Sequence, residues 1–171
     1  MSETFFKDAN VEKQLADFVL NEPILSMGKV TLAFEQEFAS WHKKKHCIMF
    51  NSGSSANLAL FAALLNLKKL TKGDKVGVNA VTWSTNVMPL IQLGFEPILI
   101  DVEPDEVTID LNRVKDYIKE LKALFVTNVL GLDYPLDSLK SICESNNVLL
   151  LEDNCEALGC YHNEKLMGNF G

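Results

Sequence analysis

Apolar and polar positions alternate along the chain in blocks that predict strands separated by helices. Short apolar runs of strand length occur at residues 46–50, 75–80, 97–101, 123–128 and 148–152. Between and after them lie longer segments with helical periodicity, at residues 55–69, 85–93, 111–121 and 136–145. Strands that alternate with helices in this way favour a parallel sheet with helices on both faces. We therefore predict an α/β fold with a mostly parallel sheet.

The first 45 residues contain helical patterns without strands, and we assign residues 1–45 to a separate N-terminal helical segment. Residues 11–20 and 31–42 are amphipathic, and the second stretch bears an aromatic stripe that we assign to core packing or a subunit contact. This stripe consists of Phe34, Phe38 and Trp41. Residues 46–171 then form the α/β domain, which ends in a short hairpin. His162 lies at the turn of this hairpin, where we expect it to be exposed rather than catalytic.

Composition and charge are those of an ordinary folded protein. The 171 residues, 47% hydrophobic and 23% charged, suffice for one domain with a real core. The net charge of -7 argues against a nucleic-acid partner. No run approaches the ~18 apolar residues of a membrane span, and the N-terminus does not resemble a signal peptide. The four cysteines show no metal-ligand spacing, so we expect no metal site and a reduced, cytoplasmic setting.

Three junctions between strands and helices carry side chains that could form one site. Asp153 ends an apolar run at the carboxyl end of a predicted strand, the edge at which open α/β sheets bind ligands. A carboxylate in such a place needs a cation or a strong donor, and a protonated heterocyclic nitrogen would satisfy it. The alternative is that Asp153 caps the next helix.

The other two junctions offer an anion site and an aromatic surface. A turn rich in Ser, residues 51–57, precedes an apolar helix, whose free N–H groups and dipole favour an anion. Neither the dinucleotide fingerprint nor the Walker A motif is present. Trp83 opens another helix, where its indole could stack on a planar ring. A plain capped helix and ordinary packing are the alternatives. Together the three junctions predict a pocket for a flat, phosphorylated, pyridine-like cofactor.

From about Pro23 to Gly171, the sequence resembles the N-terminal half of the DegT-type sugar aminotransferases. Members of this family are fold-type-I enzymes dependent on pyridoxal 5'-phosphate (PLP). The resemblance rests on the order and spacing of Ser26-Met27-Gly28, Gly53-Ser54-Ser55, Trp83-Ser84-Thr85, Asp101-Val102-Glu103, Asn128-Val129-Leu130-Gly131, Glu152-Asp153 and Gly168-Asn169-Phe170-Gly171. It implies a truncated fold-type-I large domain that binds PLP or pyridoxamine 5'-phosphate. It also implies a nucleotide-sugar substrate and a homodimer for the full-length enzyme.

The resemblance implies a role for each candidate residue. Ser54 and Ser55 match the positions that hold the cofactor phosphate, and Trp83 matches the aromatic residue stacked on the pyridine ring. Asp153 matches the acid that pairs with the ring nitrogen. Glu156 falls near the ring hydroxyl, where the aminotransferases usually carry Gln or His, and its acidity resembles the 3-dehydrase branch. The alternative for Glu156 is an acid in the first turn of a helix.

The implied activity is removal of the C3 hydroxyl from a nucleotide-linked 4-keto-6-deoxy sugar, in deoxy- or amino-sugar biosynthesis for cell-surface polysaccharides. Amino transfer from an amino acid to the keto sugar is the alternative, and a non-catalytic truncated remnant is a second alternative. The deciding catalytic residue is a Schiff-base Lys in aminotransferases and a His in 3-dehydrases. We expect it beyond Gly171, because none of the lysines here matches the family position.

Overall fold

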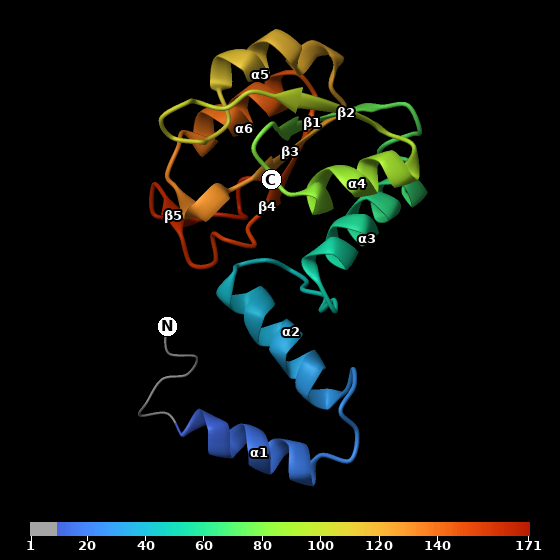
Figure 1. Cartoon of the computed structure of the whole chain (residues 1–171), viewed down its shortest axis with the longest axis vertical. Coiled ribbons are helices and arrows are strands. Elements are labelled where there is room, and N and C mark those ends of the chain that lie inside the picture. Colours follow the sequence, from blue (N-terminus) through green and yellow to red (C-terminus); the bar gives the residue numbers. More distant parts are fainter. Residues whose placement is uncertain (1–9) are drawn as a thin grey trace. The chain divides into compact units, whose positions relative to one another are not determined.

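The computed structural model describes residues 10–171, which form two compact units, one up to Met49 and the other Phe50–Gly171 (Figure 1). The first unit contains α1 (Val11–Asn21) and α2 (Lys29–Trp41). Along α2 the ring centroids of Phe34 and Phe38 lie 5.6 Å apart, and those of Phe38 and Trp41 lie 5.4 Å apart. The aromatic stripe is therefore continuous on the helix, and its role in core packing or a subunit contact stays a prediction.

The second unit is built on a four-stranded parallel sheet in the order β2-β1-β3-β4. The predicted parallel sheet is thus confirmed. Its elements in chain order are α3 (Gly53–Asn66), β1 (Lys75–Asn79), α4 (Ser84–Leu93), β2 (Glu96–Ile100), α5 (Leu111–Tyr117), β3 (Ala123–Thr127), α6 (Leu136–Ser145) and β4 (Leu149–Asp153). Short 3₁₀ turns occupy Ile118–Glu120 and Val129–Gly131. The predicted hairpin is also present, as β5 (Tyr161–His162) paired antiparallel with β6 (Lys165–Leu166).

The strand predicted at residues 46–50 does not form. This segment has no strand partner, and the side chains of Ile48, Met49 and Phe50 are exposed. The backbone N–H of Met49 instead donates to a carboxylate oxygen of Glu35 at 2.7 Å. A strand exists only when a neighbour completes its hydrogen-bond ladder. The prediction was therefore wrong because an apolar run of strand length does not by itself supply a partner.

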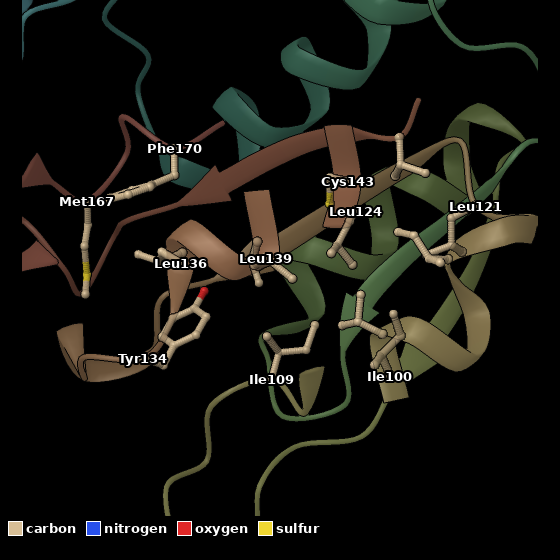
Figure 2. Packing of buried hydrophobic residues seen from close by; sticks show 14 of the residues in the cluster. Ile100, Ile109, Leu121, Leu124, Tyr134, Leu136, Leu139, Cys143, Met167 and Phe170 are labelled. Carbon is tan, nitrogen blue, oxygen red and sulfur yellow. The ribbon is translucent and has the colours of Figure 1, made fainter. Parts of the chain in front are cut away.

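Helices cover both faces of the sheet, as the sequence predicts (Figure 1). On β3, Leu124 and Val126 belong to the core beneath α5 and α6, whereas Ala123 and Phe125 belong to the core beneath α3 and α4. Successive side chains of a strand point to opposite faces, so one apolar run supplies both cores. Figure 2 shows the first core, in which Leu136, Leu139 and Cys143 of α6 pack with Leu124.

Cys143 is almost completely buried in this core. Burial, and then the nearby charge of Glu144, raises the pKa of its thiol to about 12. The thiol is therefore neutral at physiological pH and acts as a small core residue. In the part of the chain that the structure describes, no helix is both long enough and apolar enough to cross a membrane.

Gly77, in the middle of β1, is required by close packing on the sheet. A Cβ atom at this position would lie 2.7 Å from Cδ1 of Leu121 and 2.8 Å from Cδ1 of both Ile100 and Leu124. These distances are well below an ordinary van der Waals contact, and all three neighbours are buried core side chains. Because Gly77 has no side chain, Leu121, Ile100 and Leu124 can pack directly against β1.

We expect Gly77→Ala to lower the free energy of unfolding by about 1–3 kcal/mol, because an extra methyl group overpacks this core. Equilibrium urea denaturation measures the change. The matched control is Gly53→Ala, since a Cβ atom at Gly53 meets nothing within 4 Å. Equal losses in the two variants would contradict the packing argument.

Candidate functional site

A cavity of about 160 Å³ lies at the carboxyl edge of the sheet. It is lined by Gly53, Asn57, Trp83, Thr85, Asn86, Thr127, Asp153, Cys155 and Glu156. The lining comes from the N-terminal turns of α3 and α4 and from the ends of β3 and β4. From β1 the chain continues to β2, which lies on one side of β1. β3 lies on the other side of β1 and is followed by β4, so the direction in which strands are added to the sheet reverses between β1 and β3. Such a switch point is where open α/β sheets bind ligands.

Asp153 is the last residue of β4, and its carboxylate accepts three hydrogen bonds. Oδ2 accepts from the side-chain amide of Asn57 at 3.1 Å and from that of Asn86 at 2.9 Å. Oδ1 accepts from the backbone N–H of Cys155 at 3.0 Å. The residues that follow form turns rather than a helix. Asp153 is therefore not a helix cap, and Glu156 is not in a helical first turn.

The neighbouring acid, Glu152, binds the backbone of the chain. Oε1 accepts from the N–H groups of Phe170 and Gly171 at 2.7 and 2.6 Å. Oε2 accepts from the N–H of Gly168 at 2.8 Å and from the amide of Asn128 at 3.2 Å. These four donors use the acceptor capacity of a carboxylate. Glu152 therefore anchors the segment after β6 to the end of β4.

Asn128 extends this anchor to the loop after β3. Its Oδ1 accepts from the hydroxyl of Tyr134 at 2.7 Å, and its amide also reaches Oδ1 of Asn154 at 2.7 Å. Burial, and then the charge of Glu152, raises the pKa of Tyr134, so its hydroxyl keeps the proton that it donates. The strand ends beside the cavity are thus held by a connected set of hydrogen-bonded polar groups.

Trp83 and the Ser-rich turn flank the cavity on the helix side. Trp83 immediately precedes α4, is 48% exposed and lines the cavity. Ser52 caps α3, since its Oγ accepts from the N–H of Ser55 at 3.2 Å and donates to Oγ of Ser55 at 3.1 Å. Ser54 is exposed and Ser55 is half-buried, and neither lines the cavity. The structure therefore brings Trp83, Asp153 and Glu156 together, with Ser54 and Ser55 in the adjacent first turn of α3.

Glu156 links the loop after β4 to the loop after β3. Its Oε2 accepts from the backbone N–H of Leu130 at 3.1 Å. Leu130 has a φ of 53°, a left-handed conformation that is uncommon for a residue other than glycine. The hydrogen bond holds Glu156 against this strained loop at the cavity wall. Its role near a ring hydroxyl stays a prediction.

The lining residues that received no role from sequence reasoning include Asn57, Asn86 and Thr127. Asn57 is the buried polar residue in the first half of the otherwise apolar helix α3, and Asn86 lies in the first turn of α4. A buried amide needs hydrogen-bond partners, so an Asn within a helix that faces the core indicates a polar contact there. The partner, Asp153, is 96 residues from Asn57 and 67 from Asn86, and local pattern does not reveal it.

His162 is buried, which corrects the expectation that it is exposed. Its Nδ1 hydrogen-bonds to the Asp133 carboxylate, its Nε2 lies 3.4 Å from an oxygen of Asp137, and its ring packs against Phe170. The turn itself is made by Asn163 and Glu164, which both have positive φ, so His162 belongs to β5 and faces inward. His162 does not line the cavity. Within residues 10–171, no cluster of three His, Cys, Asp or Glu side chains could hold a metal ion.

The sheet order and the cavity at its carboxyl edge place this domain in the open α/β class, whose members bind ligands at that edge. The chain belongs to the DegT/DnrJ/EryC1/StrS aminotransferase family, which it matches over residues 7–171. The resemblance drawn from the sequence motifs is thus confirmed.

Similar proteins are found among the 3-dehydratases. The chain is 36% identical over 165 residues to the GDP-4-keto-6-deoxy-D-mannose 3-dehydratase of Escherichia coli O55:H7, covering 95% of this chain and 42% of that protein. It is 36% identical over 156 residues to the Yersinia pseudotuberculosis protein of the same name, covering 90% and 40%. The structure of the E. coli enzyme with bound hydrated PLP matches with a TM-score of 0.88 at 34% identity, over 96% of this chain and 42% of that one.

These matches confirm the predicted fold, that of the PLP-dependent fold-type-I enzymes. The chain spans about two fifths of the length of the curated relatives that it matches.

We expect Glu152→Gln to lower the free energy of unfolding by about 2–4 kcal/mol. Glutamine replaces one acceptor oxygen by an NH₂ group that faces N–H donors, and hydrogen bonds to a charged group are worth about 1.5–3 kcal/mol each. Equilibrium urea denaturation again measures the loss. The control is Glu144→Gln, which removes the same charge from an exposed pair with Lys140 at 3.7 Å. A Glu152→Gln variant as stable as the control would refute the anchoring role.

Proposed function

We propose that this chain forms the cofactor side of a PLP-dependent 3-dehydrase that acts on a nucleotide-linked 4-keto-6-deoxy sugar. The observation that carries the proposal is the cavity in which the Asp153 carboxylate and the Trp83 indole meet beside the N-terminus of α3. Two relatives are named for this reaction on a GDP-linked sugar, and a solved relative binds PLP. The product would serve deoxy-sugar biosynthesis for cell-surface polysaccharides.

The side chains present fit the cofactor. An ionised carboxylate only accepts hydrogen bonds, which suits the protonated nitrogen of a pyridine ring, and Asp153 has about one of four acceptor positions left. The half-exposed indole of Trp83 offers a flat surface for stacking. Ser54 and Ser55 lie in the first turn of α3, where free N–H groups and the helix dipole favour a phosphate.

Each residue would have a separate task in this mechanism. PLP, when bound, supplies an electron sink for the substrate. Asp153 would keep the proton on the ring nitrogen, and Trp83 would fix the ring plane and exclude water from one face. Ser54 and Ser55 would hold the phosphate. Glu156, oriented by its bond to Leu130, would lie beside the ring hydroxyl. Among residues 10–171, no Lys or His lines the cavity, so the tasks proposed for these residues are to bind and orient the cofactor.

Amino transfer to the same keto sugar is the second candidate, because the family is described by that activity. The acidic Glu156 favours the 3-dehydrase. A non-catalytic remnant would keep the fold but bind no cofactor. A homodimer and a cytoplasmic setting stay predictions.

We expect the chain to bind PLP and Asp153→Asn to weaken the binding about tenfold, since one charge-assisted hydrogen bond is lost. An absorbance titration measures both affinities. Asp105→Asn, on an exposed loop, is the control for charge removal. Absence of PLP binding in the unaltered chain would contradict the proposal and favour the remnant.

In the complete enzyme, Asp153→Asn should sharply reduce turnover while leaving the fold intact, because the ring nitrogen loses its partner. NMR of the sugar product, after incubation with a GDP-linked 4-keto-6-deoxy sugar and an amino-acid donor, separates the two activities. A 3-deoxy sugar supports the dehydrase, whereas an amino sugar that retains its C3 hydroxyl supports the aminotransferase. Unchanged turnover in the variant would remove Asp153 from the mechanism.

A further inference from the structure

The buried carboxamides near the carboxyl edge of the sheet include Asn57, Asn79 and Asn86, and two of these three hold the Asp153 carboxylate. Asn57, Asn79 and Asn86 are only 9%, 1% and 2% exposed. Asn57 and Asn86 both donate to Oδ2 of Asp153. Asn79 instead exchanges two hydrogen bonds with the backbone of Thr127 and does not contact Asp153. The three amides therefore have similar burial but different partners.

Each of the two donors is itself fixed. The amide nitrogen of Asn57 also reaches the carbonyl oxygen of Thr85, at 3.3 Å. The amide nitrogen of Asn86 also reaches Oγ1 of Thr127 at 3.1 Å, and that hydroxyl is paired with Thr82 at 2.7 Å. Because carboxylate and carbonyl oxygens only accept, both N–H bonds of each amide are used and its orientation is determined. Neither donor can turn away from Asp153 without losing a second hydrogen bond.

Two donors on the same oxygen restrict the rotation of a carboxylate, whose terminal torsion is otherwise broad. With Oδ2 occupied twice, the acceptor position that remains is on Oδ1, which holds the single bond from Cys155. Resting on the proposed PLP function, we propose that Asn57 and Asn86 are positioning residues that hold Asp153 in the orientation required by the ring nitrogen of the cofactor.

The positions of the two amides on the helices give the arrangement a second consequence. Asn57 lies on α3, whose first turn contains Ser54 and Ser55. Asn86 lies on α4, which begins directly after Trp83. The two bonds to Asp153 therefore connect the phosphate side, the stacking side and the ring-nitrogen side of the cavity. Binding sites work best when such supporting contacts are formed before the ligand arrives.

The test compares two cofactors that differ only at the ring nitrogen. PLP and its deaza analogue, in which a C–H group replaces that nitrogen, are titrated into the unaltered chain and into Asn57→Ser, Asn86→Ser and Asn79→Ser. The ratio of the two dissociation constants reports the contact with Asp153 and is insensitive to a general loosening of the site. Circular dichroism and thermal unfolding show which variants are folded.

We expect the unaltered chain to prefer PLP over the deaza analogue, and each of Asn57→Ser and Asn86→Ser to reduce that preference about tenfold. Asn79→Ser should keep the preference, whatever its effect on stability. Retention of the full preference in both of the first two variants would overturn the inference. It would also be overturned if neither of these variants folds while Asn79→Ser does, because the amides would then be structural only.

Two further outcomes concern the proposed function rather than the positioning residues. If the unaltered chain binds neither compound, the cofactor proposal fails. If it binds both equally, the pairing of Asp153 with the ring nitrogen fails, and with it any positioning role. The inference is supported if Asn57→Ser and Asn86→Ser lose the preference for PLP over the deaza analogue while Asn79→Ser keeps it.

Discussion

The hydrogen bonds from Asn57 and Asn86 to the Asp153 carboxylate are the interaction on which the rest of the site depends. A charge near a buried strand end is costly unless donors satisfy it, and here two amides and a backbone N–H do so. The amides come from α3 and α4, and the acid comes from β4. One side chain therefore connects two helices and a strand around the cavity, and these two helices carry the Ser-rich turn and follow Trp83.

The two adjacent acids show how strand geometry separates structural and functional roles. Glu152 and Asp153 are consecutive, so their side chains leave β4 in opposite directions. Glu152 meets the backbone of the segment after β6, while Asp153 meets the cavity. The structural acid holds the strand end in place, and the cavity acid depends on that strand end for its position.

Among residues 10–171, no Lys or His lines this cavity. Its lining offers two carboxylates, an indole, amides, hydroxyls and a thiol, and this combination of a flat apolar surface with polar groups is typical of ligand sites. Glu156, whose acidity the family resemblance links to the 3-dehydrase branch, has a defined position, because its Oε2 accepts from the backbone N–H of Leu130. Binding of a cofactor and choice of reaction are separable properties, and the proposed function assigns only the first to these residues.

Sequence by itself determined the local elements and the class of site. Helical and strand patterns predicted the parallel sheet, and the positions of Asp153 and Trp83 after strands predicted a cavity at its edge, because parallel strands end on the same side. The prediction of a strand failed at residues 46–50, where the apolar run has no partner strand. The prediction of an exposed side chain failed at His162, because its partners Asp133 and Asp137 come from another part of the chain. Only tertiary structure decided that Asn57 and Asn86 meet Asp153. Periodicity reports which residues are buried, but a hydrogen bond between distant residues depends on how the elements pack in three dimensions.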